Sequence, residues 1–155
     1  MALEIERKFL ISGDFRPYVF RSVHIMQGYL SLAAERTVRV RIKGEKGFIT
    51  VKSARSDNGL SRYEWEKEIP VEEARDLIRL CEAGIIDKTR HFVKADPYVY
   101  EIDEFHGENE GLVVAEIELP SEDSVFSKPE WLGKEVTDDE RYYNSMLIIK
   151  PYTKW

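Results

Sequence analysis

Charged residues of both signs occupy alternate positions in several strand-like segments of this chain. In one such segment, Arg39, Arg41 and Lys43 alternate with three aliphatic residues. Because successive side chains of a strand point to opposite faces of a sheet, each segment has one ionic face and one largely apolar face. The same alternation recurs in the groups Glu4, Glu6 and Lys8; Glu64, Glu66 and Glu68; Lys88 and Arg90; Glu101 and Asp103; and Glu116 and Glu118.

Eight segments with this alternation are predicted to form strands, and turn-forming residues separate them. The predicted strands are residues 3–11, 24–31, 36–44, 47–54, 61–69, 87–94, 98–105 and 112–119. Gly44 and Gly47 flank an expected hairpin turn at Glu45 and Lys46. Further turns are expected at Asp57-Asn58-Gly59, at Asp96-Pro97 and at residues 106–111.

Two segments have helical rather than strand-like periodicity. Apolar residues recur at helical spacing in residues 71–81. The second predicted helix begins at Thr137, because Thr137 and Glu140 have the spacing of a capping box, and it ends before Pro151. Short turns or helices are also expected near residues 13–22 and 122–126.

These elements predict an α+β fold with a single domain over residues 1–155. In this fold an eight-stranded antiparallel β-barrel forms a tunnel with a charged interior, and the helices pack outside. The helices are expected outside because a barrel of eight strands has no room for a helix within it. The ionic strand faces then line the lumen. Since burying one unpaired charge costs several kcal/mol, the lumen must stay wet and its acids and bases must nearly balance.

Two other interpretations of the alternating charge remain open. Alternating charge on one strand usually marks a solvated sheet face, although its recurrence over many strands favours a lumen. A porin-like membrane barrel also has a polar lumen. The two helices disfavour it, and so does the expected absence of an export signal, because the chain starts with charged residues where a signal peptide has an apolar run.

The composition limits the classes of partner and the location. A net charge of −6 disfavours extended nucleic acid as a partner, and no apolar run approaches the roughly 20 residues of a membrane helix. The single cysteine, Cys81, excludes an intramolecular disulfide and is expected to be a buried, inert thiol. We therefore expect a cytoplasmic monomer or homodimer whose partner is a small molecule and neither a membrane nor nucleic acid.

The alternating charges also indicate a chemistry. Two carboxylates such as Glu4 and Glu6, about 7 Å apart on one strand face, offer the oxygen ligands that Mg²⁺ and Mn²⁺ prefer. Arginine side chains match phosphate oxygens two at a time. The candidate phosphate ligands are Arg39, Arg41, Lys52, Arg62, Lys88 and Arg90. No single acidic pair is specific, but the whole set fits metal-assisted chemistry on a polyphosphate.

Nearly the whole chain resembles the CYTH superfamily, also called triphosphate tunnel metalloenzymes. The segment Glu4-Ile5-Glu6-Arg7-Lys8-Phe9 is similar to the E-x-E-x-K signature of that family, at the place where the family has it. The resemblance continues through residues 37–41, 50–52, 62–66, 88–90, 102–103, 115–118, 133–137 and 141–145. It implies an eight-stranded tunnel with helices outside, and activity on inorganic tripolyphosphate, nucleoside or RNA 5′-triphosphates, thiamine triphosphate, or ATP that is cyclised.

The resemblance also implies roles for individual residues. The triphosphate is expected to be held by Lys8, Arg39, Arg41, Lys52, Lys88 and Arg90. One or two Mg²⁺ or Mn²⁺ ions are expected on Glu4, Glu6, Glu64, Glu66, Glu116 and Glu118, directly or through water, with Asp103 supporting this metal set. Lys8, Lys88 and Glu6 are the candidate catalytic residues. Tyr29 is expected to pack against its neighbours, with a place near the tunnel mouth as the alternative.

The sequence therefore predicts a divalent-metal-dependent triphosphatase that hydrolyses inorganic tripolyphosphate, since phosphoryl transfer needs charge neutralisation and alignment more than covalent help. A metal-activated water is the expected nucleophile for in-line attack, and Lys88 as a base is the alternative. Other functions that remain open are a class IV-type adenylate cyclase, a thiamine or nucleoside triphosphatase, and a non-catalytic polyphosphate-binding module. The repeated acidic pairs disfavour the last, because phosphate binding alone needs cations rather than metal ligands.

Overall fold

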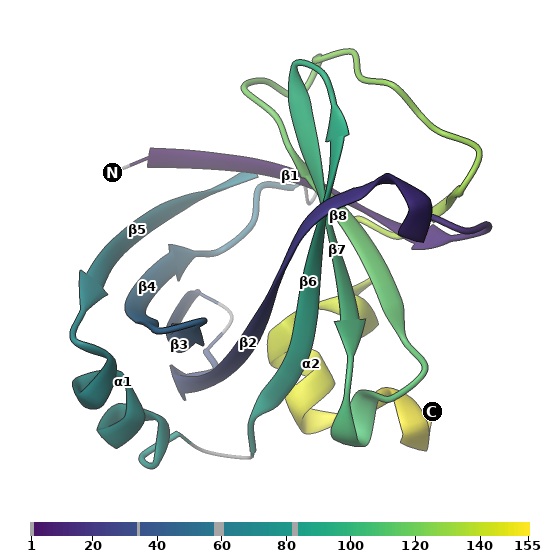
Figure 1. The fold of residues 1–155 in the computed structure, drawn as a ribbon. Helices are drawn as coiled ribbons and strands as arrows, with labels where there is room; N and C mark the ends of the chain where they lie inside the picture. The colour runs from purple at the N-terminus through teal and green to yellow at the C-terminus, as the bar shows by residue number, and fades with distance from the viewer. Residues whose placement is uncertain (1, 34, 58–60, 82–83) are drawn as a thin grey trace.

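The computed structural model describes residues 2–33, 35–57, 61–81 and 84–155, and for residues 2–4 it describes the backbone alone. The strands are β1 (Ala2–Ile11), β2 (Val19–Ser31), β3 (Arg36–Lys43), β4 (Lys46–Ser53), β5 (Ser61–Ile69), β6 (Ile86–Ala95), β7 (Tyr98–Phe105), β8 (Val113–Glu118) and β9 (Leu132–Glu135) (Figure 1). β2 begins at Val19 rather than at residue 24, and β9 was not predicted. The other strands agree with the prediction to within one residue at each end.

The strands close into an antiparallel barrel through β1. The sheet order is β5-β4-β3-β2-β6-β7-β8-β1-β9, and β5 also pairs with β1. The first residues of β1 pair with β5, with Glu4 opposite Arg62, and later residues pair with β8, with Lys8 opposite Glu116. These two pairings join the ends of an eight-stranded sheet, which confirms the predicted closed barrel (Figure 1).

β9 is an additional strand on β1, outside the eight that close the barrel. Ile11 lies opposite Leu132 in this pairing. A Cβ atom at Gly133 would lie 2.9 Å from the Leu10 carbonyl oxygen, so glycine is required where the two backbones approach. A strand of only four residues that contains glycine shows too little alternation to be recognised from the sequence.

The turn between β3 and β4 lies one residue earlier than predicted. Lys43 is opposite Lys46, so the two loop residues are Gly44 and Glu45. The φ angle of +61° at Gly44 is in the left-handed region, which glycine adopts without steric cost. Of the other predicted turns, Asp96-Pro97 joins β6 to β7 and residues 106–111 join β7 to β8, whereas Asn58 and Gly59 lie outside the described residues.

The helices are shorter than predicted. α1 spans Val71–Ile78, and the second helical region consists of the 3₁₀ turn η3 (Glu140–Tyr142) followed by α2 (Asn144–Ile149). Three further 3₁₀ turns are η1 (Arg16–Tyr18), η2 (Gly107–Asn109) and η4 (Tyr152–Lys154). Residues 122–126 contain a turn but no helix. Within the described part of the chain, no helix has the length and apolar character that a membrane span requires.

The predicted capping box at Thr137 is wrong. The Thr137 hydroxyl accepts a hydrogen bond from the Lys8 backbone N–H at 3.1 Å and donates one to the Glu135 carboxylate. Thr137 therefore fastens the chain to β1 instead of starting a helix. Asp139 is the residue that caps η3, because its Oδ1 accepts a hydrogen bond from the Arg141 backbone N–H at 3.1 Å.

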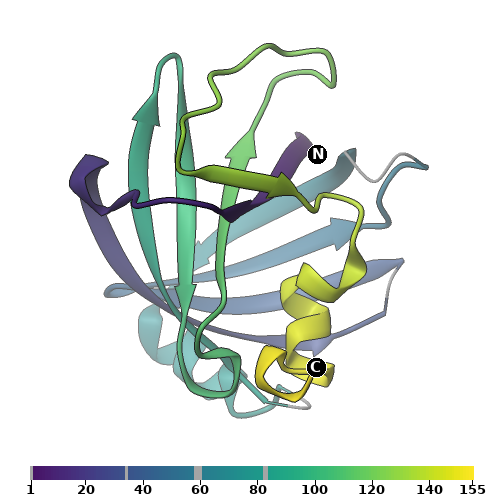
Figure 2. The ribbon, with the colours of Figure 1, turned by 90° about the vertical axis from the view of Figure 1, so that its right-hand side faces the viewer.

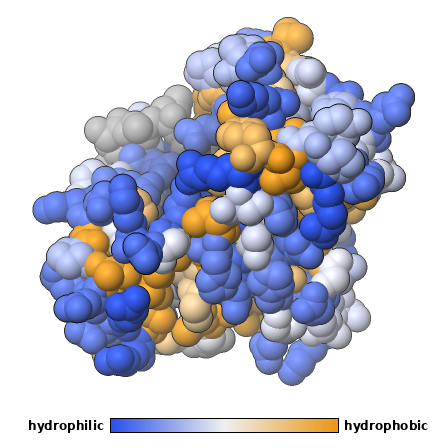
Figure 3. Space-filling model, viewed as in Figure 1, coloured by the Kyte–Doolittle hydropathy of each residue, from blue (hydrophilic) through white to orange (hydrophobic). Residues whose placement is uncertain are grey.

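Apolar side chains pack on the outside of the barrel. α1 covers β3 and β4, where Ala74 and Ile78 pack against Val40, as predicted for an outer helix. A larger cluster covers the outer faces of β1, β7 and β8, and in it the rings of Tyr100 and Trp131 lie 5.2 Å apart. On the molecular face in Figure 3, hydrophobic residues lie in groups between larger hydrophilic areas.

α2 lies across one end of the barrel. Its Leu147 packs in a third apolar cluster with Ile86 and Val114. Two positions further along each strand, Lys88 and Glu116 lie on the same faces as Ile86 and Val114, because side chains alternate. The cluster therefore fills one end of the lumen, beyond the charged residues. Figure 2 shows α2 and the C-terminus together at this end of the strands. Only α1 thus takes the outer position that was predicted for both helices.

Candidate active site

The inward strand faces surround a cavity of about 250 Å³, and every strand from β1 to β8 contributes to its lining. The acidic lining residues are Glu6, Glu64, Glu66, Glu101, Glu116 and Glu118, and the basic ones are Lys8, Arg39, Arg41, Lys43, Lys52, Arg55, Arg62, Lys88 and Arg90. Residues that are far apart in the sequence thus share one space, because the barrel turns alternate positions of each strand inward.

Most of the residues that the sequence analysis selected lie in this lining. The side chain of Glu4 is outside the described residues. Asp103 is buried behind the lining, with an exposed fraction of 1%. Glu68, which alternates with Glu64 and Glu66, is exposed and does not line the cavity, because it lies next to the end of β5. Placement in the lining does not assign a role, so the roles remain predictions.

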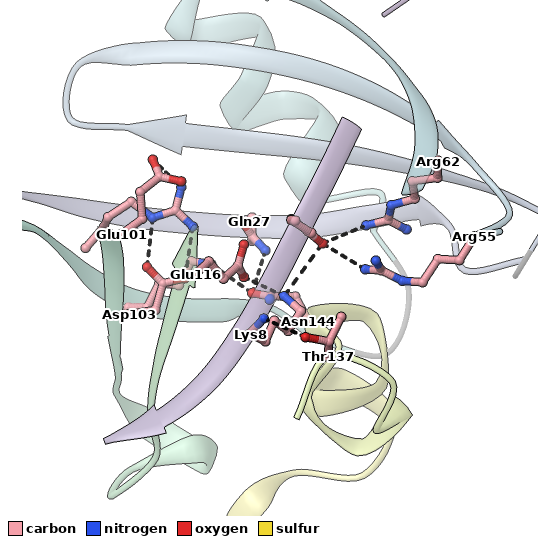
Figure 4. Close-up of polar contacts among 12 residues, drawn as sticks. Lys8, Gln27, Arg55, Arg62, Glu101, Asp103, Glu116, Thr137 and Asn144 are labelled. Atoms are coloured by element: carbon pink, nitrogen blue, oxygen red, sulfur yellow. Dashed lines mark hydrogen bonds and ion pairs between the residues drawn. The ribbon is translucent and has the colours of Figure 1, made fainter. Parts of the chain in front are cut away.

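Asp103 is the counter-ion of two cations on β6 (Figure 4). Arg90 donates from Nε to Oδ1 at 2.8 Å and from Nη2 to Oδ2 at 2.9 Å, and Lys88 donates from Nζ to Oδ2 at 2.7 Å. Burial alone would raise the pKa of Asp103, but Arg90 and Lys88 hold it well below its ordinary value. Both carboxylate oxygens accept hydrogen bonds, so Asp103 positions Lys88 and Arg90, and its support of a metal site stays a prediction.

Lys88 is a buried amine between two acceptors. Besides Asp103, its Nζ donates a hydrogen bond to Asn144 Oδ1 at 2.8 Å. Burial lowers the pKa of Lys88 to about 7, and the charges of Arg90 and Arg41 act in the same direction, although Asp103 opposes them. The negative charge of Asp103 next to Nζ favours the charged ammonium form.

The inner face of β3 forms a basic wall. Arg41 is buried, and its Nε donates a hydrogen bond to Gln27 Oε1 at 2.9 Å. Burial, together with the charges of Arg39 and Arg90, lowers the pKa of Arg41 to about 9. Lys43 has a lowered pKa for the same reasons, burial first and Arg90 second. An anion in the cavity would relieve the repulsion among these cations, so this wall suits a polyanion.

Lys8 lies between two acidic side chains, Glu6 on its own strand β1 and Glu116 on β8. Its Nζ lies 2.5 Å from Glu116 Oε1 and 3.8 Å from Glu6 Oε1. Burial would lower the pKa of Lys8, but Glu116 and Glu6 raise it above its ordinary value. Lys8 therefore stays charged beside Glu116 and Glu6.

The acids near Glu118 have the chemistry of a divalent-metal site. Burial raises the pKa of Glu118, and Glu64, Glu101 and Glu6 raise it further by like-charge repulsion. A divalent cation would relieve this repulsion, and carboxylate oxygens are the ligands that it prefers. Among the described residues, no three His, Cys, Asp or Glu side chains already form a coordination group. Mg²⁺ commonly needs only one or two carboxylates beside phosphate oxygens and water, so these residues fit a metal that binds together with a polyphosphate.

Comparisons with known proteins identify the family. Residues 2–146 match the CYTH domain. This chain belongs to the CYTH family. An inorganic triphosphatase of Acetivibrio thermocellus is 48% identical over 153 residues, which cover 98% of this chain and 97% of that protein. An inorganic triphosphatase of Nitrosomonas europaea is 38% identical over 150 residues, which cover 94% and 97%. The crystal structure of the inorganic triphosphatase NE1496 matches with a TM-score of 0.66 at 34% identity and covers 94% of this chain and 97% of that one.

The site of this CYTH protein also contains uncharged residues that the sequence analysis did not assign. Asn144 Oδ1 accepts hydrogen bonds from Gln27 Nε2 at 3.0 Å and from Lys88, and Asn144 lines the cavity with its neighbours Tyr143 and Ser145. Gln27 could have been found by continuing the alternation of β2. No periodic pattern in the sequence predicts that the first residues of α2 line the lumen, because their position depends on how α2 packs.

Tyr29 and Arg55 also line the cavity of this CYTH site. Tyr29 lines the cavity and also packs in the apolar cluster beneath it, so the expected packing of Tyr29 is confirmed, and a place near the tunnel mouth stays a prediction. Arg55 was not predicted, because it lies between β4 and β5, where no alternation exists to place its side chain.

Proposed function

We propose that this protein is a divalent-metal-dependent triphosphatase that hydrolyses inorganic tripolyphosphate to pyrophosphate and phosphate. The observation that carries the proposal is the cavity itself, in which buried cations and a cluster of carboxylates face one another. Relatives that are 48% and 38% identical over almost the whole chain are named inorganic triphosphatases, which supports the same activity here.

The cations of the lining are the proposed phosphate ligands. Arg39 and Arg41 on β3 and Arg90 on β6 are strand-borne guanidiniums, which pair with phosphate oxygens in a fixed geometry. Preorganised charges of this kind are worth more in a buried site than in water, because no solvent has to reorganise during the reaction. The full proposed set is Lys8, Arg39, Arg41, Lys52, Arg62, Lys88 and Arg90.

The acids of the lining are the proposed metal ligands. Glu6, Glu64, Glu66, Glu116 and Glu118 would hold Mg²⁺ or Mn²⁺ directly or through water, and Glu4 is proposed with them from its position in the sequence alone. When bound, such an ion neutralises phosphate charge and lowers the pKa of a coordinated water. The protein side chains provide the alignment: the acids fix the metal on one part of the wall, and the cations fix the phosphates on another.

Lys88 is proposed to act as a cation rather than as a base. Its Nζ donates to two acceptors, Asp103 and Asn144, and the negative charge of Asp103 favours the ammonium form. A bound polyphosphate would add negative charge beside that of Asp103 and favour the charged form further. Lys88 would then hold a phosphate oxygen during the reaction. Because its pKa is lowered to about 7, the alternative role as a base is distinguished by the pH dependence of activity.

The test is phosphate release from tripolyphosphate with Mg²⁺ or Mn²⁺, using protein whose folding is verified by circular dichroism. ATP, GTP and thiamine triphosphate serve as competing substrates, and chromatography of the ATP reaction would reveal cyclic AMP if the protein were a cyclase. Faster turnover of tripolyphosphate than of the others supports the proposal. Folded protein that binds tripolyphosphate without turnover would instead identify a binding module. A cytoplasmic location, a monomeric or homodimeric state and the absence of a nucleic-acid partner stay predictions.

A further inference from the structure

Arg55 differs from the other charged residues that line the cavity. Among the charged lining residues that the structure describes, Arg55 is the one that lies in a connecting segment rather than in a strand, since it follows the end of β4 at Ser53. Its side chain is nevertheless only 11% exposed. A cation on a connection can change its position with less cost than a cation on a paired strand, because no ladder of backbone hydrogen bonds fixes it.

Arg55 is paired with a residue that the proposed function needs for metal binding. Its Nη2 donates a hydrogen bond to Glu6 Oε1 at 2.9 Å. The same oxygen lies 3.8 Å from Lys8 Nζ and 3.9 Å from Arg62 Nη2. In Figure 4 the Arg55 and Arg62 side chains both point towards β1. Glu6 is thus buried in a group of cations, of which Arg55 makes the shortest of these contacts.

The second contact of Arg55 is with the start of α2. The centre of its guanidinium lies 4.3 Å from the centroid of the Tyr143 ring, a distance at which the ring face attracts a cation. Tyr143 also lines the cavity. The stacking holds the guanidinium next to the lumen through the ring face and does not itself use the N–H donors.

The contact between Arg55 and Glu6 conflicts with metal binding at Glu6. A divalent cation on Oε1 would take the electron pairs that now accept the Arg55 hydrogen bond, and it would repel the guanidinium at close range. A metal ion on Oε1 therefore competes with Arg55 for Glu6, and its binding favours a position of Arg55 away from Glu6. A buried guanidinium that loses its carboxylate needs another anion, and the phosphate groups of a substrate in the same cavity are the anions at hand.

We propose that Arg55 exchanges partners during the reaction cycle: it binds Glu6 in the metal-free protein, and it binds the polyphosphate, stacked on Tyr143, once a divalent metal occupies Glu6. This inference rests on the proposed function. It makes Arg55 a substrate-positioning residue and gives it opposite effects on two ligands, because it competes with the metal but attracts the phosphate chain.

The experiment compares the wild type with Arg55→Ala for two ligands. Mn²⁺ binding to the metal-free protein is followed by loss of the electron paramagnetic resonance signal of the free ion. Binding of diimidotriphosphate, in which NH groups replace both bridging oxygens of tripolyphosphate, is measured by calorimetry at saturating Mn²⁺. Arg55→Ala is expected to bind Mn²⁺ roughly threefold or more tightly and the analogue roughly tenfold or more weakly. Arg55→Lys, which keeps the charge, should bind the analogue more tightly than Arg55→Ala does.

Arg16→Ala is the matched control. Arg16 likewise pairs with a carboxylate, that of Glu104 at 3.1 Å, and lies over a ring, that of Phe15 at 5.1 Å, but it does so outside the cavity. Both affinities should stay at the wild-type value in Arg16→Ala. Unchanged or weaker Mn²⁺ binding in folded Arg55→Ala, or unchanged analogue binding, overturns the exchange.

The outcome can be separated from that of the proposed function. If the wild type does not hydrolyse tripolyphosphate, the proposed function fails, and the Mn²⁺ comparison still decides whether Arg55 competes for Glu6. If the wild type hydrolyses tripolyphosphate while Arg55→Ala alters neither affinity, the function stands and the partner exchange is wrong.

Discussion

Lys88 and Asp103 form an ion pair that is closed off from solvent, with Nζ 2.7 Å from Oδ2 and each side chain only 1% exposed. Asp103 also accepts two hydrogen bonds from Arg90, one from Nε and one from Nη2. One carboxylate therefore compensates two buried cations of the cavity. Removing one partner of such a pair is costly because it leaves a buried charge uncompensated, whereas a solvent-exposed pair contributes little.

Asp103→Ala is expected to lower the free energy of unfolding by about 3–5 kcal/mol. The substitution leaves Lys88 and Arg90 without their carboxylate. Urea denaturation at neutral pH measures the effect. Asp76→Ala is the control, since Asp76 is an aspartate that pairs with Arg79 at the surface at 3.1 Å, so its loss should cost at most about 1 kcal/mol. Equal effects of the two substitutions would contradict the structural role of Asp103.

The ionisation of Lys88 should make stability depend on pH. Burial lowers the pKa of Lys88 from 10.5 to about 7 in the folded protein. Between these two values the unfolded chain binds a proton that the folded protein does not, so the free energy of unfolding rises with pH in this window. Lys88→Met lacks this contribution. The difference in unfolding free energy, wild type minus Lys88→Met, should therefore increase between pH 7 and pH 10 in urea titrations. A flat or decreasing difference would show that the pKa is not lowered.

The proposed role of Lys88 as a cation and the alternative role as a base predict opposite pH dependences of activity. If its ammonium group holds a phosphate, the wild type loses activity as Lys88 deprotonates above about pH 7, whereas Lys88→Arg keeps its charge. The ratio of kcat/KM, wild type to Lys88→Arg, should then fall with rising pH. Ionisation of the substrate and the metal affects both proteins equally and cancels in this ratio. A ratio that rises with pH would identify Lys88 as the base, because only the neutral amine accepts a proton.

The barrel and most of its charged lining could be predicted because they depend on a local pattern. Arg39 and Arg41 alternate with aliphatic residues. Because side-chain direction repeats every two residues along a strand, both arginines point to one side whatever the tertiary structure. Only the choice of side needed a further argument, namely that α1 and other outer elements must cover the apolar faces. The wrong expectation for Glu68 follows from the same rule, since alternation does not show where a strand passes the end of a cavity.

The remaining features depend on contacts between distant segments. Thr137 has the spacing of a helix cap, but its hydroxyl bonds the backbone of β1 instead, and no local pattern reveals that choice. Asn144 reaches Lys88 only because α2 packs across the barrel end. Arg55 sits in a connection, where side-chain direction has no period. Each of these residues takes its place from tertiary packing, which overrides local propensity.

Glu6→Ala tests the proposed metal ligands, and Arg41→Ala tests the proposed phosphate ligands. Each should reduce kcat for tripolyphosphate by roughly tenfold or more, if electrostatic stabilisation of a few kcal/mol is lost. Glu6→Ala should in addition raise the metal concentration needed for half-maximal rate, because a ligand is removed, whereas Arg41→Ala should act mainly on the substrate. Glu68→Ala is the matched control, since Glu68 is an exposed acid outside the lining and should leave the rate near that of the wild type. Steady-state rates of phosphate release across a Mn²⁺ titration measure all three, and near-normal rates in Glu6→Ala and Arg41→Ala would remove both assignments.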